Sequence, residues 1–138
     1  RFESQLRVGK QNKLLKAHEI ISEKRAIDVF DELLGKDVKP SVLHGDLWAG
    51  NYLIATDGTP YLIDPATYWG HSMVDIAMSK LFGGFGNEFY SAYHEIIPKK
   101  GNYNAQIDLY QLYFLLVHLN LFGRSYYKSV SSILSGYF

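Results

Sequence analysis

Residues 43–51 read LHGDLWAGN and residues 62–65 read LIDP, and these two stretches are the most informative feature of the chain. They contain Asp46, then Asn51 five residues later, and Asp64 at the end of an apolar strand. One carboxylate can accept a hydroxyl proton, while an amide oxygen and a second carboxylate can hold Mg²⁺ against nucleotide phosphates. The combination is typical of a phosphotransfer site.

The three polar residues have distinct candidate roles. Asp46 is the candidate general base, because an attacking hydroxyl loses its proton and a nearby carboxylate can take it. Asn51 and Asp64 are candidate Mg²⁺ ligands, because Mg²⁺ prefers oxygen donors and usually takes only one or two from protein. Each residue alone also fits an ordinary turn, where Asp and Asn are common beside Gly or Pro. Their occurrence together favours the chemical interpretation.

Two further residues are candidates for supporting this loop. His44 belongs with the catalytic residues as a brace that hydrogen-bonds backbone carbonyls, not as the base itself. Asp75 lies three residues after Ser72, which is a capping-box spacing. The alternative for Asp75 is a buried carboxylate that receives backbone amides of the catalytic loop and holds it rigid. The sequence leaves both interpretations of Asp75 open.

Composition narrows the class of protein. The 138 residues fit one domain. The 14 basic and 14 acidic residues cancel, so we expect neither nucleic acid nor a membrane surface as a partner. No cysteine is present, which excludes disulfides and thiolate metal sites. The most apolar stretch, residues 109–122, is interrupted by polar residues and is shorter than the roughly 20 residues that span a bilayer. We expect a soluble, cytoplasmic protein, and the start at Arg1 suggests that an N-terminal portion is missing.

The hydrophobic pattern predicts an α+β fold that is mainly helical. Helices are expected over residues 2–22, 26–34, 72–82, 87–97, 104–121 and 124–134. Strands are expected at 51–55 and 61–63, joined by the hairpin turn TDGTP. A hairpin fixes the distance between its flanks, so Asn51 and Asp64 should lie close together. We therefore predict a single domain, residues 1–138, with one small hairpin that carries the catalytic and metal loops.

The motifs resemble a known family. Residues 44–51 and 62–66, followed by YWG at 68–70, VDIAM at 74–78 and LFGGF at 81–85, resemble the fructosamine kinase (ketosamine-3-kinase) family. This family belongs to the aminoglycoside-phosphotransferase and protein-kinase-like superfamily. The resemblance is strong over residues 40–90, and the flanking helices match only in pattern.

The resemblance implies roles for the same residues. Asp46 would be the base, Asn51 and Asp64 the Mg²⁺ ligands, and Asp75 the structural carboxylate. The implied reaction is ATP-dependent phosphorylation of a sugar hydroxyl on a ketoamine, which in the family leads to repair of glycated protein. Trp48 would pack its flat indole against the sugar or its amine-bearing aglycone, or else anchor the loop in the core. Tyr68 and Trp69 are weaker candidates for packing against the same part of the substrate.

The sequence departs from the family in one large respect. No segment before His44 supplies the phosphate-covering loop, the phosphate-binding lysine or the adenine hinge of the family's N-terminal lobe. The chain therefore resembles the C-terminal lobe alone, and its expected partners are a ketoamine substrate and the N-terminal lobe of the same polypeptide. As a free fragment it should bind ATP weakly and show little turnover.

Other functions remain open at this point. Another small-molecule kinase of the superfamily would act on an aminoglycoside, choline or a homoserine-like acceptor. A non-catalytic, pseudokinase-like binding module is disfavoured, because such a module has no chemical need for Asp46, Asn51 and Asp64 together. A metallophosphoesterase would use two metals with several His or carboxylate ligands, and the apolar residues that follow Asn51 disfavour it.

Overall fold

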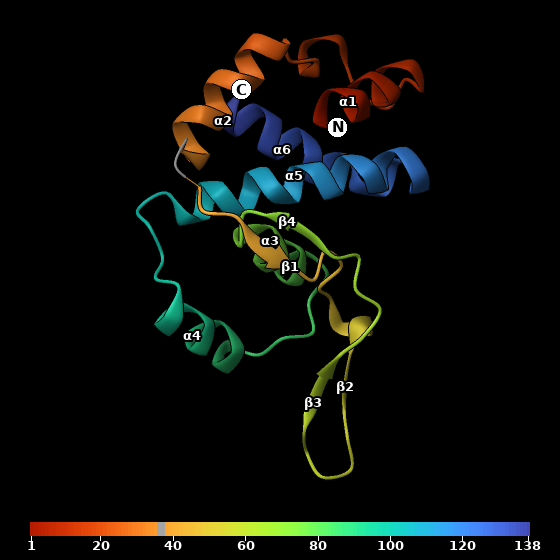
Figure 1. Cartoon of the computed structure of the whole chain (residues 1–138). Helices are drawn as coiled ribbons and strands as arrows, with labels where there is room; N and C mark the ends of the chain where they lie inside the picture. The colour runs from red at the N-terminus through yellow and green to blue at the C-terminus, as the bar shows by residue number, and fades with distance from the viewer. Residues whose placement is uncertain (36–37) are drawn as a thin grey trace. The chain divides into compact units, whose positions relative to one another are not determined.

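The computed structural model describes residues 1–35 and 38–138, which divide into two compact units. The first unit holds the described residues 1–35 and 108–138, and the second holds residues 38–107. Figure 1 shows the elements of both units along the chain. The mainly helical α+β class predicted from the sequence is confirmed. The assignment of residues 1–138 to a single domain stays a prediction.

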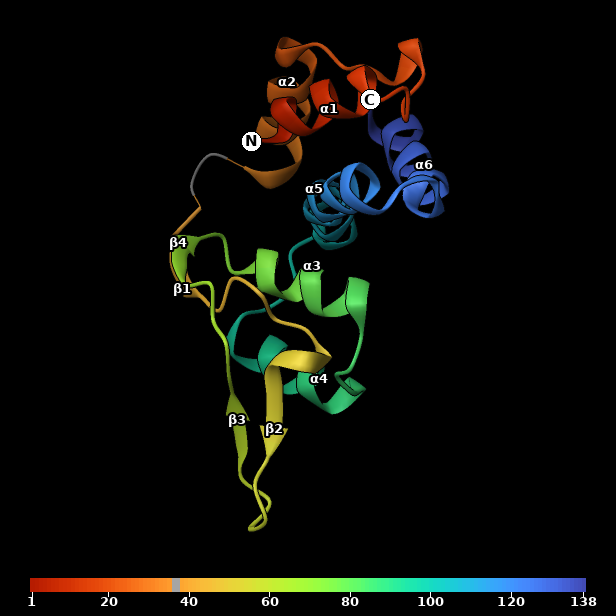
Figure 2. The ribbon, with the colours of Figure 1, turned by 90° about the vertical axis from the view of Figure 1, so that its right-hand side faces the viewer.

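The first unit is built from helices. It contains α1 (Phe2–Gln11), α2 (Glu23–Leu34), the part of α5 (Tyr103–Phe122) from residue 108 onward, and α6 (Tyr127–Tyr137). Single 3₁₀ turns lie at Ala17–Glu19 and Arg124–Tyr126. Both views show α6 running alongside α5 (Figures 1 and 2).

Helix α5 supplies fully buried side chains to the core of the first unit. Its Leu112, Leu116 and Leu119 are completely buried and are spaced by four and three residues, as one face of a helix requires. Burying a leucine side chain is worth about 1.5–3 kcal/mol. The apolar helix predicted over residues 104–121 is confirmed.

The single helix predicted over residues 2–22 is wrong. Helix α1 ends at Gln11, and Lys13 adopts a left-handed φ of 56°. The backbone N–H of Leu15 then donates to the carbonyl of Gly9 at 3.2 Å. A Cβ on Gly9 would lie only 2.8 Å from Leu15 Cδ1, so the absent side chain is what lets the buried Leu15 fold back onto the helix. The hydrophobic periodicity of residues 2–22 gives no indication of this reversal.

Helix α2 begins earlier than predicted and ends where predicted. Ser22 caps its start, because the Ser22 hydroxyl oxygen accepts a hydrogen bond from the backbone N–H of Arg25 at 3.2 Å. Gly35 follows the last residue with a φ of 80°, a conformation that favours glycine.

The second unit combines two small antiparallel sheets with helices. Strand β1 (Ser41–Leu43) pairs with β4 (Tyr68–Gly70), and β2 (Tyr52–Ile54) pairs with β3 (Pro60–Leu62). Helices α3 (Met73–Phe82) and α4 (Asn87–Ile96) follow, and then the beginning of α5. Figure 2 shows the β2–β3 hairpin extending away from α3.

The predicted hairpin is confirmed, whereas the β1–β4 sheet was not predicted. In the hairpin turn, the N–H of Ala55 donates to the carbonyl of Thr59 at 2.9 Å, and Gly58 takes a φ of 84°. Strands β1 and β4 have three residues each and pair Leu43 with Tyr68 across a long stretch of chain. Three residues are too few to show the alternation that marks a strand, and β1 and β4, unlike β2 and β3, are not joined by a recognisable hairpin turn.

Within the described residues, no helix has the length and apolarity needed to cross a lipid bilayer.

Glu19 is a buried charged residue in the first unit. It is 3% exposed, and its carboxylate accepts hydrogen bonds from the hydroxyl of Tyr127 at 3.0 Å and from the backbone N–H of Lys16 at 2.7 Å. Burial is the largest single influence on Glu19 and opposes its ionisation. Hydrogen bonds from Ser131, Lys16 and Tyr127, together with the nearby His18, outweigh burial, so the pKa of Glu19 lies below its usual 4.5.

We expect Glu19→Gln to lower the free energy of unfolding at neutral pH by roughly 1.5–3 kcal/mol, the worth of hydrogen bonds to a charged group. A carboxyl with a lowered pKa contributes stability that is present above its unfolded pKa and lost as the pH falls through its folded pKa. The difference between wild type and variant should therefore shrink below about pH 4.5.

Urea unfolding at neutral pH and at about pH 3 measures this difference. The matched control is Glu23→Gln, which changes an exposed glutamate at the start of α2. An equal loss for Glu19→Gln at both pH values would contradict the role assigned to the carboxylate.

Candidate functional site

The loop at residues 44–46 is held by a carboxylate of α3. Asp75 Oδ2 accepts a hydrogen bond from the backbone N–H of His44 at 2.7 Å, and Asp75 Oδ1 accepts one from the N–H of Gly45 at 2.9 Å. The Ser72 side chain makes no capping hydrogen bond at the start of α3. Of the two interpretations left open by the sequence, these contacts match the carboxylate that receives loop amides.

The ring of His44 links this loop to the segment that follows β3. The backbone N–H of Asp46 donates to His44 Nδ1 at 3.3 Å, so Nδ1 acts as an acceptor and Nε2 carries the ring hydrogen. Nε2 lies 3.0 Å from the carbonyl oxygen of Ile63 and donates to it. Both ring nitrogens are thus engaged with backbone, which suits a brace and leaves neither free to take a substrate proton.

Backbone hydrogen bonds bring Asp64 beside the loop. The N–H of Ile63 donates to the carbonyl of Asn51 at 2.9 Å, and the N–H of Ala66 donates to the carbonyl of His44 at 2.8 Å. Asp64 lies between these two anchored residues. The hydrogen bond between Ile63 and Asn51 lies just beyond the paired residues of β2 and β3. It brings Asp64, the next residue, close to Asn51, as the sequence led us to expect.

Gly45 is the residue that permits this close approach. Its φ is 81°, and a Cβ at this position would overlap the carbonyl oxygen of Ala66 and lie 2.8 Å from its carbonyl carbon. Only glycine combines the left-handed backbone with the required space. The segment that contains Asp64 can therefore pack directly on the loop that contains Asp46.

Asn51 and Asp46 form a hydrogen-bonded pair. Asn51 is 7% exposed, and its Nδ2 donates to the carbonyl oxygen of Asp46 at 2.9 Å and to Asp46 Oδ2 at 2.8 Å. Because Nδ2 donates to Asp46, the amide oxygen of Asn51 is left as an acceptor for another group. The second carboxylate oxygen of Asp46 is likewise left for a donor other than Asn51.

Asp64 adopts an unusual backbone conformation. It is exposed and has a φ of 50°, in the left-handed region that non-glycine residues seldom enter. Asp tolerates this region better than most residues do. Residues held in such conformations cluster at functional sites.

The donor set fits Mg²⁺ better than a metal held wholly by protein. Across residues 1–35 and 38–138, no group of three His, Asp or Glu side chains is placed to share a metal ion. One amide oxygen from Asn51 and one carboxylate from Asp64 match the few protein ligands that Mg²⁺ takes when phosphates and water complete its octahedron.

The three aromatic candidates lie in different surroundings. The Trp48 indole lies over Gly50, where a Cβ would be 2.9 Å from Trp48 Cζ3, yet Trp48 stays 40% exposed. Tyr68 packs near Gly45, whose Cβ position lies 3.2 Å from Tyr68 Cδ1. Trp69 is 71% exposed and, as the next residue of β4, points to the opposite face from Tyr68. Tyr68 thus lies beside the loop at residues 44–46, and Trp48 lies beside the turn that contains Asn51, whereas Trp69 faces away from Tyr68.

Sequence reasoning did not single out Tyr93 as a neighbour of Asp75. Tyr93 and Asp75 both line a cavity of about 180 Å³ in the second unit. Burial raises the pKa of the Tyr93 hydroxyl, a hydrogen bond with Ser72 lowers it, and the charge of Asp75 raises it further. Tyr93 occurs in an ordinary helical pattern, so no local signal in the sequence marks it.

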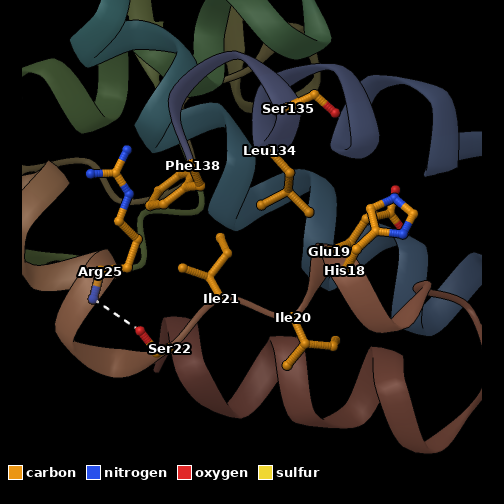
Figure 3. Close-up of a pocket in the computed structure, with 9 residues that line it drawn as sticks. All are labelled: His18, Glu19, Ile20, Ile21, Ser22, Arg25, Leu134, Ser135 and Phe138. Atoms are coloured by element: carbon orange, nitrogen blue, oxygen red, sulfur yellow. Dashed lines mark hydrogen bonds between the residues drawn. The ribbon is translucent and has the colours of Figure 1, made fainter.

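A second cavity, of about 320 Å³, belongs to the first unit. Figure 3 shows Ile21, Leu134 and Phe138 around it, together with Arg25. None of the predicted site residues lines this cavity.

The fold and the loop geometry define a class of protein. A mainly helical chain that carries its Asp and Asn loop next to a small hairpin corresponds to the C-terminal lobe of a protein-kinase-like phosphotransferase. A family model for fructosamine kinase matches residues 1–138. The chain belongs to the fructosamine kinase family.

Individual relatives agree with this assignment. A protein named "Probable ketoamine kinase" from Lactiplantibacillus plantarum is 44% identical over 143 residues, which cover 99% of this chain and 51% of the relative. A chloroplastic protein-ribulosamine 3-kinase from Oryza sativa subsp. indica is 48% identical over 103 residues, which cover 75% of this chain and 30% of the relative. The chain thus spans about half the length of the first of these relatives and less of the second.

Solved structures give the same result. The crystal structure of a candidate fructosamine-3-kinase from Thermobifida fusca YX-ER1 superposes with a TM-score of 0.80 at 34% sequence identity. The match covers 96% of this chain and 46% of that one. A second candidate fructosamine-3-kinase, from Haemophilus somnus 129PT, also gives a TM-score of 0.80, at 31% identity.

We expect Asp75→Asn to loosen the loop at residues 44–46. An amide offers one acceptor oxygen where the carboxylate offers two, so one of the two N–H groups would face an NH₂ group. Each hydrogen bond to a charged group is worth roughly 1.5–3 kcal/mol. Hydrogen exchange of the His44 and Gly45 amides should therefore become faster than in the wild type.

Hydrogen exchange read by mass spectrometry on peptides that cover the loop checks this expectation. Asp28→Asn, which changes an exposed carboxylate of α2, is the control and should leave the loop unchanged. Unchanged protection of the loop in Asp75→Asn would show that the two hydrogen bonds do not hold it.

Proposed function

We propose that this chain acts as the C-terminal lobe of a longer enzyme that transfers the γ-phosphoryl group of ATP to a sugar hydroxyl of a fructosamine-type ketoamine. The observation that carries the proposal is the Asp46–Asn51 hydrogen-bonded pair, held beside Asp64 by the loop that Asp75 anchors. Membership of the fructosamine kinase family supports the acceptor class. The names of the ketoamine kinase and ribulosamine 3-kinase relatives agree with it.

Asp46 is the proposed general base. Its Oδ2 is held by Asn51 at 2.8 Å, which leaves Oδ1 to accept the proton of the acceptor hydroxyl. The hydroxyl oxygen then forms its bond to the γ-phosphorus as the bond to the ADP oxygen breaks. Because Asn51 donates to the carboxylate, Asp46 is fixed in orientation before the acceptor binds.

Asn51 and Asp64 are the proposed ligands of Mg²⁺ in its complex with ATP. When bound, the ion would neutralise charge on the phosphates. The amide of Asn51 is oriented for this role, because its nitrogen is engaged by Asp46 and its oxygen is not. A neutral amide also avoids placing a second carboxylate against Asp46, since like charges at that distance disfavour ionisation of both.

Trp48 and Tyr68 are the proposed wall of the acceptor site. Trp48 lies on the same short turn as Asn51, and Tyr68 lies against Gly45 of the catalytic loop. An exposed indole face can stack on a sugar ring or on an apolar aglycone. We further propose that the reaction serves the repair of glycated amines in the cytoplasm.

We expect Asp46→Asn in the full-length protein to reduce kcat by about 10²- to 10⁴-fold and to change the KM for the acceptor little, because a proton acceptor acts in the transition state. Steady-state kinetics with saturating MgATP measure both constants. The control is Asp57→Asn, in the exposed turn of the hairpin. Turnover by Asp46→Asn that equals wild type would remove Asp46 from the role of base.

We expect Asp64→Ala to abolish binding of the Mg²⁺–nucleotide complex by the full-length protein, because it removes the only charged ligand proposed for the ion. Isothermal titration with ATP in the presence and absence of Mg²⁺ tests this, with Asp57→Asn again as the control. Wild-type affinity for MgATP in Asp64→Ala would exclude Asp64 as a ligand.

The acceptor class is tested by ATP consumption in the full-length protein with a fructosyl-amine, an aminoglycoside and choline as parallel acceptors. Turnover on the fructosyl-amine alone is the expected result. Turnover on another acceptor would keep the phosphotransfer roles and replace the substrate class. MgATP binding without turnover on any acceptor would contradict the proposal and favour a non-catalytic binding module.

A further inference from the structure

The LFGGF run at residues 81–85 has no role in the chemistry proposed above. It covers the end of α3 and the start of the loop to α4. Gly83 and Gly84 both take left-handed φ values, of 74° and 105°. Two consecutive glycines in such conformations mark a backbone path that other residues follow only with strain.

Gly84 packs directly on the turn that precedes Asn51. A Cβ on Gly84 would overlap the Cβ of Ala49 and lie 2.7 Å from its Cα and 3.2 Å from its backbone nitrogen. Ala49 begins the 3₁₀ turn Ala49–Asn51, in which the N–H of Asn51 donates to the carbonyl of Trp48 at 2.9 Å. The absence of a side chain on Gly84 therefore lets the loop touch the backbone of this turn.

The same loop also contacts Tyr52, the residue that follows Asn51. The hydroxyl of Tyr52 donates to the carbonyl oxygen of Gly84 at 3.1 Å. The Tyr52 ring centroid lies 5.1 Å from that of Phe85, and the Phe85 centroid lies 4.5 Å from that of Phe89 in α4. Aromatic rings at such centroid distances attract one another in addition to burying area.

We propose that the loop at residues 83–85 is a positioning element for Asn51, with Gly84 and Tyr52 as its positioning residues. Gly84 fixes Ala49 on one side of Asn51, and Tyr52 is fixed on the other side. The Asn51 amide, held at both ends of its turn, then keeps one orientation in which its nitrogen serves Asp46 and its oxygen is left for the metal. The consequence for turnover rests on the proposed function, whereas the consequence for the turn itself does not.

The chain offers a matched control for Gly84. Gly83 has a similar positive φ, but a Cβ built on it meets nothing within 4 Å. Gly83→Ala therefore introduces the backbone strain of a left-handed alanine without pressing on Ala49. Any effect of Gly84→Ala beyond that of Gly83→Ala reports the contact with the turn.

The first measurement is hydrogen exchange of peptides that cover residues 47–52 in the full-length protein. We expect Gly84→Ala to speed exchange there by about tenfold, which corresponds to the loss of about 1.4 kcal/mol of local stability. Gly83→Ala should change it by less than about twofold. Equal changes in both variants would show that strain alone is responsible and would overturn the proposal.

The second measurement is the Mg²⁺ concentration that gives half-maximal turnover at fixed ATP. We expect Gly84→Ala to raise it by about tenfold, with a smaller change in the KM for the acceptor. Tyr52→Phe, which keeps the ring contact with Phe85 and removes the hydrogen bond to Gly84, should raise it by about threefold. This milder variant keeps the test available if Gly84→Ala does not fold.

Rescue separates positioning from general destabilisation. Ala49→Gly in the Gly84→Ala background removes the overlapping Cβ and should restore part of both the exchange protection and the Mg²⁺ requirement. An unchanged Mg²⁺ requirement in active Gly84→Ala or Tyr52→Phe protein would overturn the proposal. If the wild-type protein transfers no phosphoryl group, the proposed function fails, and the exchange comparison of Gly84→Ala with Gly83→Ala still decides whether the loop fixes the turn.

Discussion

The two hydrogen bonds from the His44 and Gly45 amides to Asp75 are the constraint on which the rest of the candidate site depends. They fix the loop to the first turn of α3. From that fixed loop, His44 reaches the carbonyl of Ile63 and receives the N–H of Ala66 on its own carbonyl, so the segment with Asp64 is placed by the same anchor. Hydrogen bonds to an ionised carboxylate are shorter and stronger than neutral ones, which suits a loop that must keep one geometry.

Residue 51 is an asparagine and not a second carboxylate. This explains how one side chain can interact with two neighbours, one through its nitrogen and one through its oxygen. The Asn51 nitrogen donates to Asp46, and its oxygen is left for a cation. A carboxylate in the same place could not donate and would repel Asp46. The proposed base and the proposed metal site are therefore coupled through one amide, and anything that rotates this amide should disturb both.

The sequence predicted most of the local features of this arrangement and missed those that depend on distant contacts. The β2–β3 hairpin follows from its turn residues, and α5 follows from the length and apolarity of its sequence. The β1–β4 pairing was not predicted, because it joins residues that are far apart in the chain. The reversal after Gln11 is local, and it was not predicted because periodicity does not reveal the left-handed Lys13 or the hydrogen bond from Leu15 to Gly9. In the site, the polar residues are recognisable from their spacing. The need for glycine at positions 45 and 84 is visible only once Ala66 and Ala49 are seen against them.

The most direct test of the account is a crystal structure of the full-length protein with Mg²⁺ and a non-hydrolysable ATP analogue. We expect Mg²⁺ at about 2.0–2.1 Å from the amide oxygen of Asn51 and from a carboxylate oxygen of Asp64. We also expect Asn51 Nδ2 still to donate to Asp46 and Asp75 still to accept the two loop amides. A metal ion held by other side chains, or an Asn51 amide turned with its nitrogen toward the phosphates, would contradict the proposed roles.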